Sequence, residues 1–186
     1  NPLKCKFDPA VLTCKGADAP DCLTAAQVET VVTMYAPAKM KDGTLVYPGM
    51  PMGSENGWSR LTTKGDPLGV WLGDYRYVLN EDASWDWRKF VLDRDVPAVD
   101  AKAPYLNAIN PDLAPFRDHG GKLLMYHGWA DHLISAENTI NYLKSVQTKM
   151  GGTQDAWLRL FMVPGMMHCR GGEGPSQFNG MAALER

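Results

Sequence analysis

The alternation of apolar and polar residues is most regular in the last third of the chain. One apolar run, over residues 122–128, has the length of a buried strand, and a second run covers residues 157–163. Between them, residues 135–150 repeat apolar side chains at helical spacing and are followed by two glycines. A strand, a helix and a second strand in this order predict a crossover connection in a parallel α/β sheet.

The first part of the chain is less regular. A helix is predicted over residues 23–35, because Thr24 and Gln27 have the spacing of a capping box and an apolar stripe follows them. A hairpin is predicted around Asp42-Gly43. Aromatic residues then recur among glycines and acids over residues 58–90, which is typical of the core of a loop-rich module.

Composition and charge exclude two classes of function. The chain has 19 Lys and Arg against 21 Asp and Glu, interspersed along its 186 residues, so no basic surface for nucleic acid is expected. No apolar stretch approaches the roughly 20 residues that a membrane-spanning helix needs. We therefore expect neither a nucleic-acid partner nor a membrane.

Cysteine usage favours an oxidising compartment. The residues between Cys14 and Cys22 are small, polar and prone to turns, so a local disulfide is easily closed. Zinc-ligand spacing is absent, and four reduced thiols are the remaining alternative. We expect a secreted or periplasmic protein, in which Cys5 and Cys169 either pair with each other or pair with cysteines outside this chain.

Two ionisable side chains follow the two predicted strands, Asp131 after the first and His168 after the second. Each has a simpler explanation alone, Asp131 as an acid at the start of a helix and His168 as an ordinary loop histidine. Because the carboxyl ends of parallel strands meet at one edge of a sheet, both are expected at that edge. Together they match the last two members of a Ser-Asp-His triad in α/β-hydrolase order.

The serine of such a triad normally lies in Gly-x-Ser-x-Gly and precedes the acid. Gly53-Ser54-Glu55-Asn56-Gly57 has the wrong spacing, and Ser176 lies beyond His168. The nucleophile is therefore expected outside this chain, in an amino-terminal part of the same precursor.

Several motifs resemble the tannase and feruloyl esterase family, which also includes a bacterial hydrolase of mono(2-hydroxyethyl) terephthalate. They are Cys5-Lys6-Phe7-Asp8-Pro9, Cys22-Leu23-Thr24-Ala25-Ala26-Gln27-Val28, Gly57-Trp58, Tyr126-His127-Gly128-Trp129-Ala130-Asp131 and Val163-Pro164-Gly165-Met166-Met167-His168-Cys169. The resemblance implies an α/β-hydrolase core with an inserted lid. Residues 1–110 would be a loop-rich, disulfide-bearing lid segment, and residues 111–186 the carboxy-terminal part of the core sheet.

Residue by residue, the resemblance gives Asp131 the role of triad acid and His168 that of base. Cys169 falls on a cysteine bonded to one beside the nucleophile, Cys14 and Cys22 on a lid disulfide, and Cys5 on a cysteine whose partner lies just upstream. A structural calcium is implied in the parent lid, before Asn1. No metal site and no cofactor are expected in this chain itself.

The resemblance implies a secreted serine carboxylic ester hydrolase acting on esters of hydroxylated aromatic acids. Trp58, Trp71 and Ile134 are candidate pocket residues, each more plausible as ordinary packing. His127 is expected near the site without acting as the base. The alternatives are a terephthalate monoester hydrolase of the same family and a non-catalytic secreted binding module.

Overall fold

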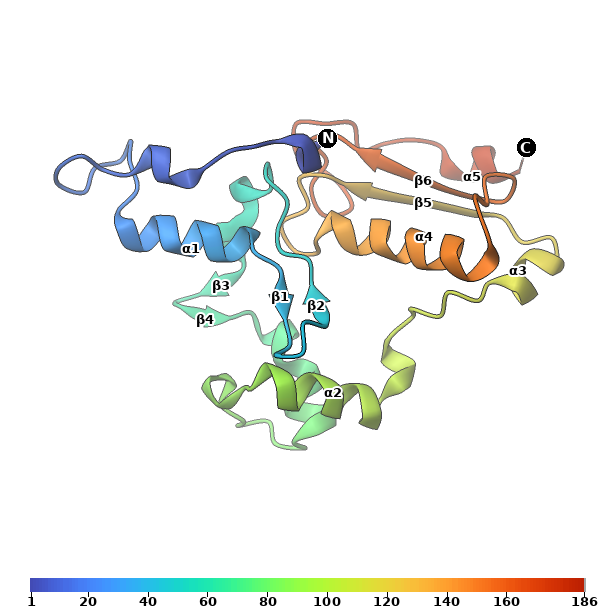
Figure 1. Ribbon diagram of the computed structural model, residues 1–186, viewed down its shortest axis with the longest axis horizontal. Helices are drawn as coiled ribbons and strands as arrows, with labels where there is room; N and C mark the ends of the chain where they lie inside the picture. The colour runs from blue at the N-terminus through green and yellow to red at the C-terminus, as the bar shows by residue number, and fades with distance from the viewer. Residues whose placement is uncertain (186) are drawn as a thin grey trace.

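The computed structural model describes residues 1–185, and its elements fall into two parts (Figure 1). The N-terminal part holds α1, α2 and two hairpins, and the C-terminal part holds β5, α4 and β6. The segment of residues 103–113 runs from α2 to α3, Ala114–Asp118, which precedes β5. That this segment contains the boundary between two domains stays a prediction.

The predicted strand-helix-strand unit is present in the C-terminal part. Strand β5, Leu123–Gly128, pairs in parallel with β6, Leu158–Val163, and Leu123 lies opposite Leu158. Helix α4, Ala136–Met150, connects them and lies along one face of the pair (Figure 1). Val146 on α4 and Leu158 on β6 are completely buried, so this layer is held by apolar packing.

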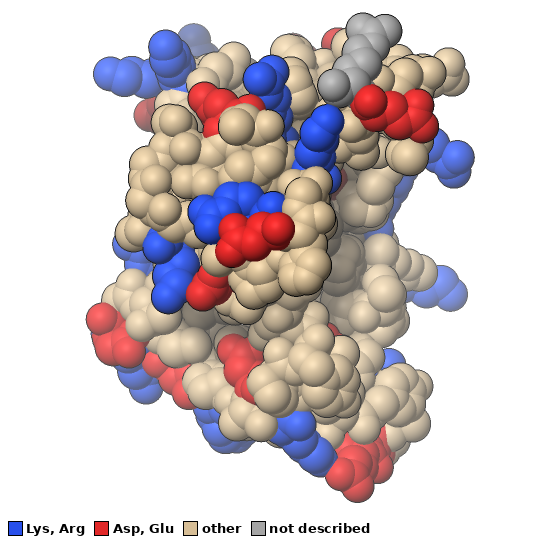
Figure 2. All heavy atoms as spheres, turned by 90° about the vertical axis from the view of Figure 1, so that its right-hand side faces the viewer, with Lys and Arg blue, Asp and Glu red and all other residues tan. Residues whose placement is uncertain are grey.

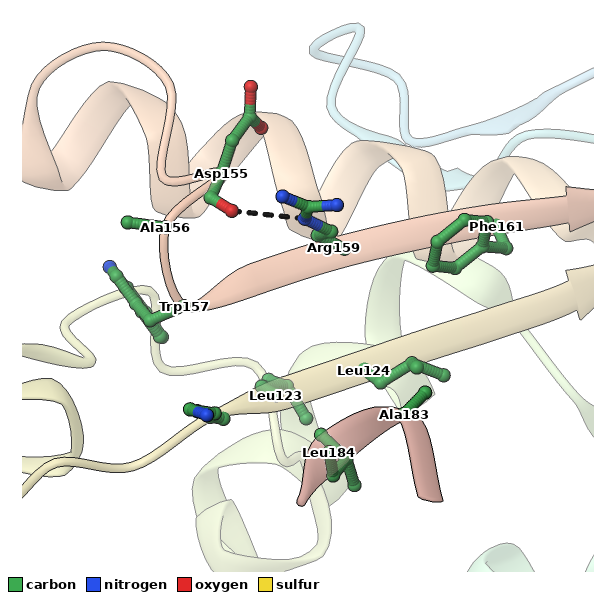
Figure 3. A pocket seen from close by; sticks show the side chains of 10 residues that line it. Leu123, Leu124, Asp155, Ala156, Trp157, Arg159, Phe161, Ala183 and Leu184 are labelled. Atoms are coloured by element: carbon green, nitrogen blue, oxygen red, sulfur yellow. Dashed lines mark hydrogen bonds between the residues drawn. The ribbon is translucent and has the colours of Figure 1, made fainter. Parts of the chain in front are cut away.

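The other face of the strand pair is largely open. Tyr126 and Phe161 lie opposite each other in the register and are 44% and 50% exposed. The Phe178 ring meets Tyr126 edge to face at 4.6 Å, and the short helix α5, Gly180–Leu184, lies beside β5. A hollow of about 340 Å³ remains between Leu184 of α5 and the first residues of the two strands. Figure 3 shows the side chains that line it.

Two predicted features of the N-terminal part are confirmed. Helix α1, Ala25–Tyr35, begins with the capping box, in which Thr24 accepts from the Gln27 N–H at 3.3 Å and the Gln27 side chain accepts from the Thr24 N–H at 2.7 Å. Strands β1, Ala38–Lys39, and β2, Leu45–Tyr47, form the predicted antiparallel hairpin. Its turn needs Gly43 at φ +90°, a conformation that glycine adopts readily.

The sequence did not reveal two other elements of this part. Strands β3, Thr62–Thr63, and β4, Asp66–Pro67, form a second, very short hairpin. Helix α2, Leu92–Lys102, contains Pro97, and its N-cap residue Val91 offers no capping side chain. The buried Asp95 carboxylate instead reaches back from within the helix and accepts from the Val91 N–H at 2.7 Å.

Three aromatic residues of the region 58–90, Tyr75, Trp85 and Phe90, pack against one another. The Tyr75 ring stacks on Trp85 at 5.8 Å and meets Phe90 edge to face at 4.9 Å. Leu72 and Trp85 are 7% and 8% exposed. These contacts form the small core that the aromatic pattern indicates.

The surface carries charges of both signs. Figure 2 shows basic and acidic side chains interspersed over the face that it presents, as the near balance of the sequence indicates. No helix among residues 1–185 is both long and apolar enough to span a lipid bilayer.

Candidate active site

The turn after β5 presents the Asp131 side chain to His168. Asp131 is almost entirely buried, with 3% of its side chain exposed. Its Oδ1 accepts backbone N–H groups from Leu133 at 2.9 Å and Ile134 at 3.0 Å, which fixes the plane of the carboxylate. Its Oδ2 lies 2.9 Å from His168 Nδ1 and 3.1 Å from His127 Nε2.

These hydrogen bonds keep Asp131 ionised. Burial by itself would raise the pKa of the carboxyl group, because it removes water from the charged form. Hydrogen bonds from His127, the Ile134 N–H, His168 and the Leu133 N–H outweigh that effect, and the pKa lies well below its ordinary value. An ionised, fixed carboxylate is what an acid that orients a histidine requires.

The loop after β6 is folded tightly against the Asp131 turn. The Ala130 N–H donates to the Met166 carbonyl at 3.0 Å, and a Cβ on Gly128 would lie 2.0 Å from that same oxygen. This close approach brings His168 to Asp131. The His168 side chain is 40% exposed, and among residues 1–185 its Nε2 has no hydrogen-bond partner. Nδ1 is thus held by the acid while Nε2 is left for a reacting group.

His168 borders an open groove of about 630 Å³. Both parts of the chain contribute to its wall, which consists of Arg60, Leu68, His132, Leu133, Met167, His168, Arg170, Gly171 and Gly172. Sequence reasoning did not identify most of these residues. The signals in the sequence were closeness to the predicted site residues and motifs: His132 and Leu133 follow Asp131, Met167 and Arg170 flank the His168 region, and Arg60 follows Gly57-Trp58.

The N-terminal part contacts the Asp131 turn at two points. A Cβ on Gly57 would lie 1.9 Å from His132 Cγ, so only glycine leaves room for the ring there. Tyr47 accepts from the Ser135 N–H at 2.8 Å and donates to Met50 Sδ at 3.1 Å. Two residues that follow Asp131, His132 and Ser135, are therefore contacted from outside the strand-helix-strand unit.

His132 is a neutral member of the site. It is 4% exposed, and its Nδ1 has no hydrogen-bond partner within the described residues. Burial lowers its pKa, the Asp131 charge opposes this, and Arg60 and His168 lower it further. The ring is therefore uncharged at neutral pH.

Comparison with known proteins identifies the family. A model of the family described as tannase and feruloyl esterase matches residues 1–186. The chain belongs to the tannase and feruloyl esterase family.

The similarity extends along the whole chain but over only part of each relative. A probable feruloyl esterase B from Emericella nidulans is 36% identical over 190 residues, which cover 100% of this chain and 36% of that protein. An esterase from Aspergillus oryzae superposes with a TM-score of 0.83 at 35% identity, over 94% of this chain and 35% of that one. Feruloyl esterase B from Aspergillus oryzae gives a TM-score of 0.82 at 32% identity, over 95% and 36%. The chain thus spans about a third of the length of these family members.

The three candidate pocket residues do not line the groove beside His168. The Trp58 indole donates to Ser54 Oγ at 3.0 Å and meets the Tyr35 ring edge to face, so it packs within the N-terminal part. Trp71 is 37% exposed. Ile134 contributes its backbone, whose N–H donates to Asp131. Their role in substrate binding stays a prediction for this member of the family.

The cysteines follow the predicted pattern in part. Cys14 and Cys22 form a disulfide with a Cα–Cα distance of 4.9 Å, which confirms that pairing. Cys5 and Cys169 are both free and exposed in the described chain, so they do not pair with each other. Cys169 has φ +59° and lies directly after His168.

Neither a nucleophile nor a metal site is found in this groove. No serine is among the groove residues within the described part of the chain. No three His, Cys, Asp or Glu side chains of residues 1–185 gather to hold a metal ion.

Proposed function

We propose that this chain is part of a secreted or periplasmic serine carboxylic ester hydrolase and supplies the acid, the base and most of the lid. The observation that carries the proposal is the 2.9 Å contact between Asp131 Oδ2 and His168 Nδ1, with Nε2 left open to the groove. Family membership and the likeness to solved esterases support the same reaction class.

In the proposed reaction, a serine from outside this chain attacks the ester carbonyl carbon, and His168 Nε2 takes the serine proton. Asp131 holds the imidazole in the correct tautomer and stabilises the imidazolium that forms. Collapse of the tetrahedral intermediate expels the alcohol, which receives its proton from His168. Water then releases the carboxylic acid in the same two steps, with His168 again acting first as base and then as acid.

Two features support an amino-terminal partner segment from the same precursor. Parallel sheets are normally covered on both faces, whereas Tyr126 and Phe161 leave one face of the β5–β6 pair exposed. Cys169, which lies next to the base, and Cys5 are both free and exposed in the described chain. We propose that both form disulfides with that segment, which would also hold the structural calcium.

The proposed substrates are small esters of hydroxylated aromatic acids. The names of the relatives, feruloyl esterase B among them, support this class. Terephthalate monoesters are the alternative within the family. Turnover of a panel of ferulate, gallate and terephthalate esters by the full-length enzyme ranks these acids directly.

Labelling with a serine-reactive fluorophosphonate tests the reaction class. The full-length enzyme should be labelled once, at a serine outside this chain, whereas the chain expressed alone should stay unlabelled. His168→Ala should abolish labelling of the full-length enzyme. Stoichiometric labelling of one of this chain's own serines would overturn the proposal.

A further inference from the structure

His127 contacts the proposed acid but has no part in the reaction described above. It is the next-to-last residue of β5, and 12% of its side chain is exposed. Its Nδ1 lies 2.7 Å from Thr139 Oγ1 on α4. Its Nε2 lies 3.1 Å from Asp131 Oδ2 and 3.2 Å from the Ile134 carbonyl oxygen.

These contacts fix the position of the ring proton. Both groups facing Nε2, the ionised Asp131 carboxylate and the Ile134 carbonyl, can only accept hydrogen bonds. Nε2 must therefore carry a hydrogen. In the neutral ring Nδ1 is then an acceptor, and the Thr139 hydroxyl is the group that donates to it. Thr139 thereby stabilises the tautomer in which His127 donates to Asp131.

With this donor, every lone-pair position of the acid is used. A carboxylate offers about four positions for hydrogen-bond donors. Two backbone N–H groups occupy Oδ1, and the two histidines His127 and His168 share Oδ2. The carboxylate therefore cannot turn, and part of the negative charge of Oδ2 is directed to His127 instead of His168.

We propose that His127 is a positioning residue of the triad, a hydrogen-bond donor that is held by Thr139, fixes Asp131 Oδ2 against His168, and moderates the basicity of His168. The inference rests on the proposed function, because it assigns a role relative to the proposed base. Without the His127 donor, the full carboxylate charge would act on the His168 imidazolium, and the base would remain protonated up to a higher pH.

Other charged and titratable groups also surround His168 and must stay unchanged in the test. They come from the Asp131 turn, from the N-terminal part and from the loop of His168 itself, and they are Asp131, His132, Arg60 and Arg170. The variants that test the inference alter only His127 and its partner Thr139, and the other substitutions serve as controls.

The test compares pH profiles of ester hydrolysis by the full-length enzyme. His127→Leu should lower kcat by about 10- to 100-fold, the range for a hydrogen bond to a charged group, with little change in KM. The acidic limb of kcat/KM, which reports the free base, should move to higher pH. His127→Gln retains an N–H donor and should return the limb to its wild-type position. Thr139→Val should give an intermediate shift, and His119→Leu, at an exposed histidine, should change nothing.

Specific outcomes would overturn the inference. One is an unchanged acidic limb in both His127→Leu and Thr139→Val, which would leave His127 a packing role only. If His127→Leu fails to fold, Thr139→Val and His127→Gln decide by the same measurement. The controls Asp131→Asn and His168→Ala distinguish failure of the proposed function from failure of the positioning role of His127. If either control variant retains full activity, the proposed function fails. If both are inactive but the pH profile of His127→Leu equals that of the wild type, only the positioning role is rejected.

Discussion

A single added methyl group at Gly57 tests how closely the N-terminal part is joined to the turn that carries Asp131. In Gly57→Ala, the new Cβ would lie 1.9 Å from His132 Cγ, whereas ordinary contacts begin at 3.4 Å. The two residues must therefore separate by about 1.5 Å. His132 is only 4% exposed, so the ring has little free space into which it can turn.

The cost follows from that forced separation. Extra methyl groups in well-packed sites typically cost about 1–3 kcal/mol, and a contact this short should fall in the upper half of that range. His132 is adjacent to Asp131, so the displacement also reaches the acid. A shift of about 1 Å in a catalytic group can lower the rate by about 100-fold. We expect the free energy of unfolding to fall by about 2–3 kcal/mol and kcat/KM to fall by about 100-fold.

Urea unfolding and steady-state ester hydrolysis of the full-length enzyme measure the two effects. Gly73→Ala is the matched control, because its backbone is helical at φ −57° and nothing lies within 4 Å of the added Cβ. It should change stability by less than about 0.5 kcal/mol. Adding His132→Ala to Gly57→Ala removes the obstructing ring and should recover most of the lost stability. A Gly57→Ala enzyme with wild-type stability and activity would refute the reasoning.

Three further predictions concern the acid, a helix cap and the disulfide. Asp131→Asn should lower kcat by about 10³- to 10⁴-fold. Because the pKa of Asp131 is lowered in the folded state, the carboxylate contributes stability above about pH 4, and this contribution is lost as the pH falls below that value. The difference in free energy of unfolding between wild type and Asp131→Asn should therefore narrow when urea titrations are repeated at lower pH. Thr24→Ala removes one side of the capping box and should cost about 1 kcal/mol in urea unfolding, and an unchanged midpoint would contradict this. Replacing Cys14 and Cys22 by serine opens a short loop and should lower the free energy of unfolding by about 2–3 kcal/mol relative to wild type. Under reducing conditions the wild type also lacks the disulfide, so the difference between wild type and variant should disappear.

The elements that could be predicted from sequence are those with local signals. The strands β5 and β6 are apolar runs, and α1 has its capping box within four residues. Helix α2 gave no such signal, because Pro97 interrupts its pattern. The side chain that accepts from the N–H of its N-cap residue Val91 is Asp95, which lies within the helix. A carboxylate that reaches back to the start of its own helix is not distinguishable in sequence from any other acid.

The same distinction applies to the site. Asp131 and His168 could be paired because the ends of parallel strands share an edge. The roles of His132 and Arg60 depend on where the N-terminal part lies against the turn, and nothing local in the sequence determines that. The contact of His127 with Asp131 depends on the tight turn between them, which brings a strand residue back onto the acid.

The contacts of Tyr47 and Gly57 with the acid's turn have a consequence for enzyme engineering. If residues 1–110 are the lid, exchanging lids between family members is an obvious way to transfer substrate preference. Such a chimera also exchanges the hydroxyl that accepts from the Ser135 N–H and the glycine that makes room for His132. A donor lid should therefore be chosen first for a tyrosine and a glycine at these two positions, and only then for the residues that face the substrate.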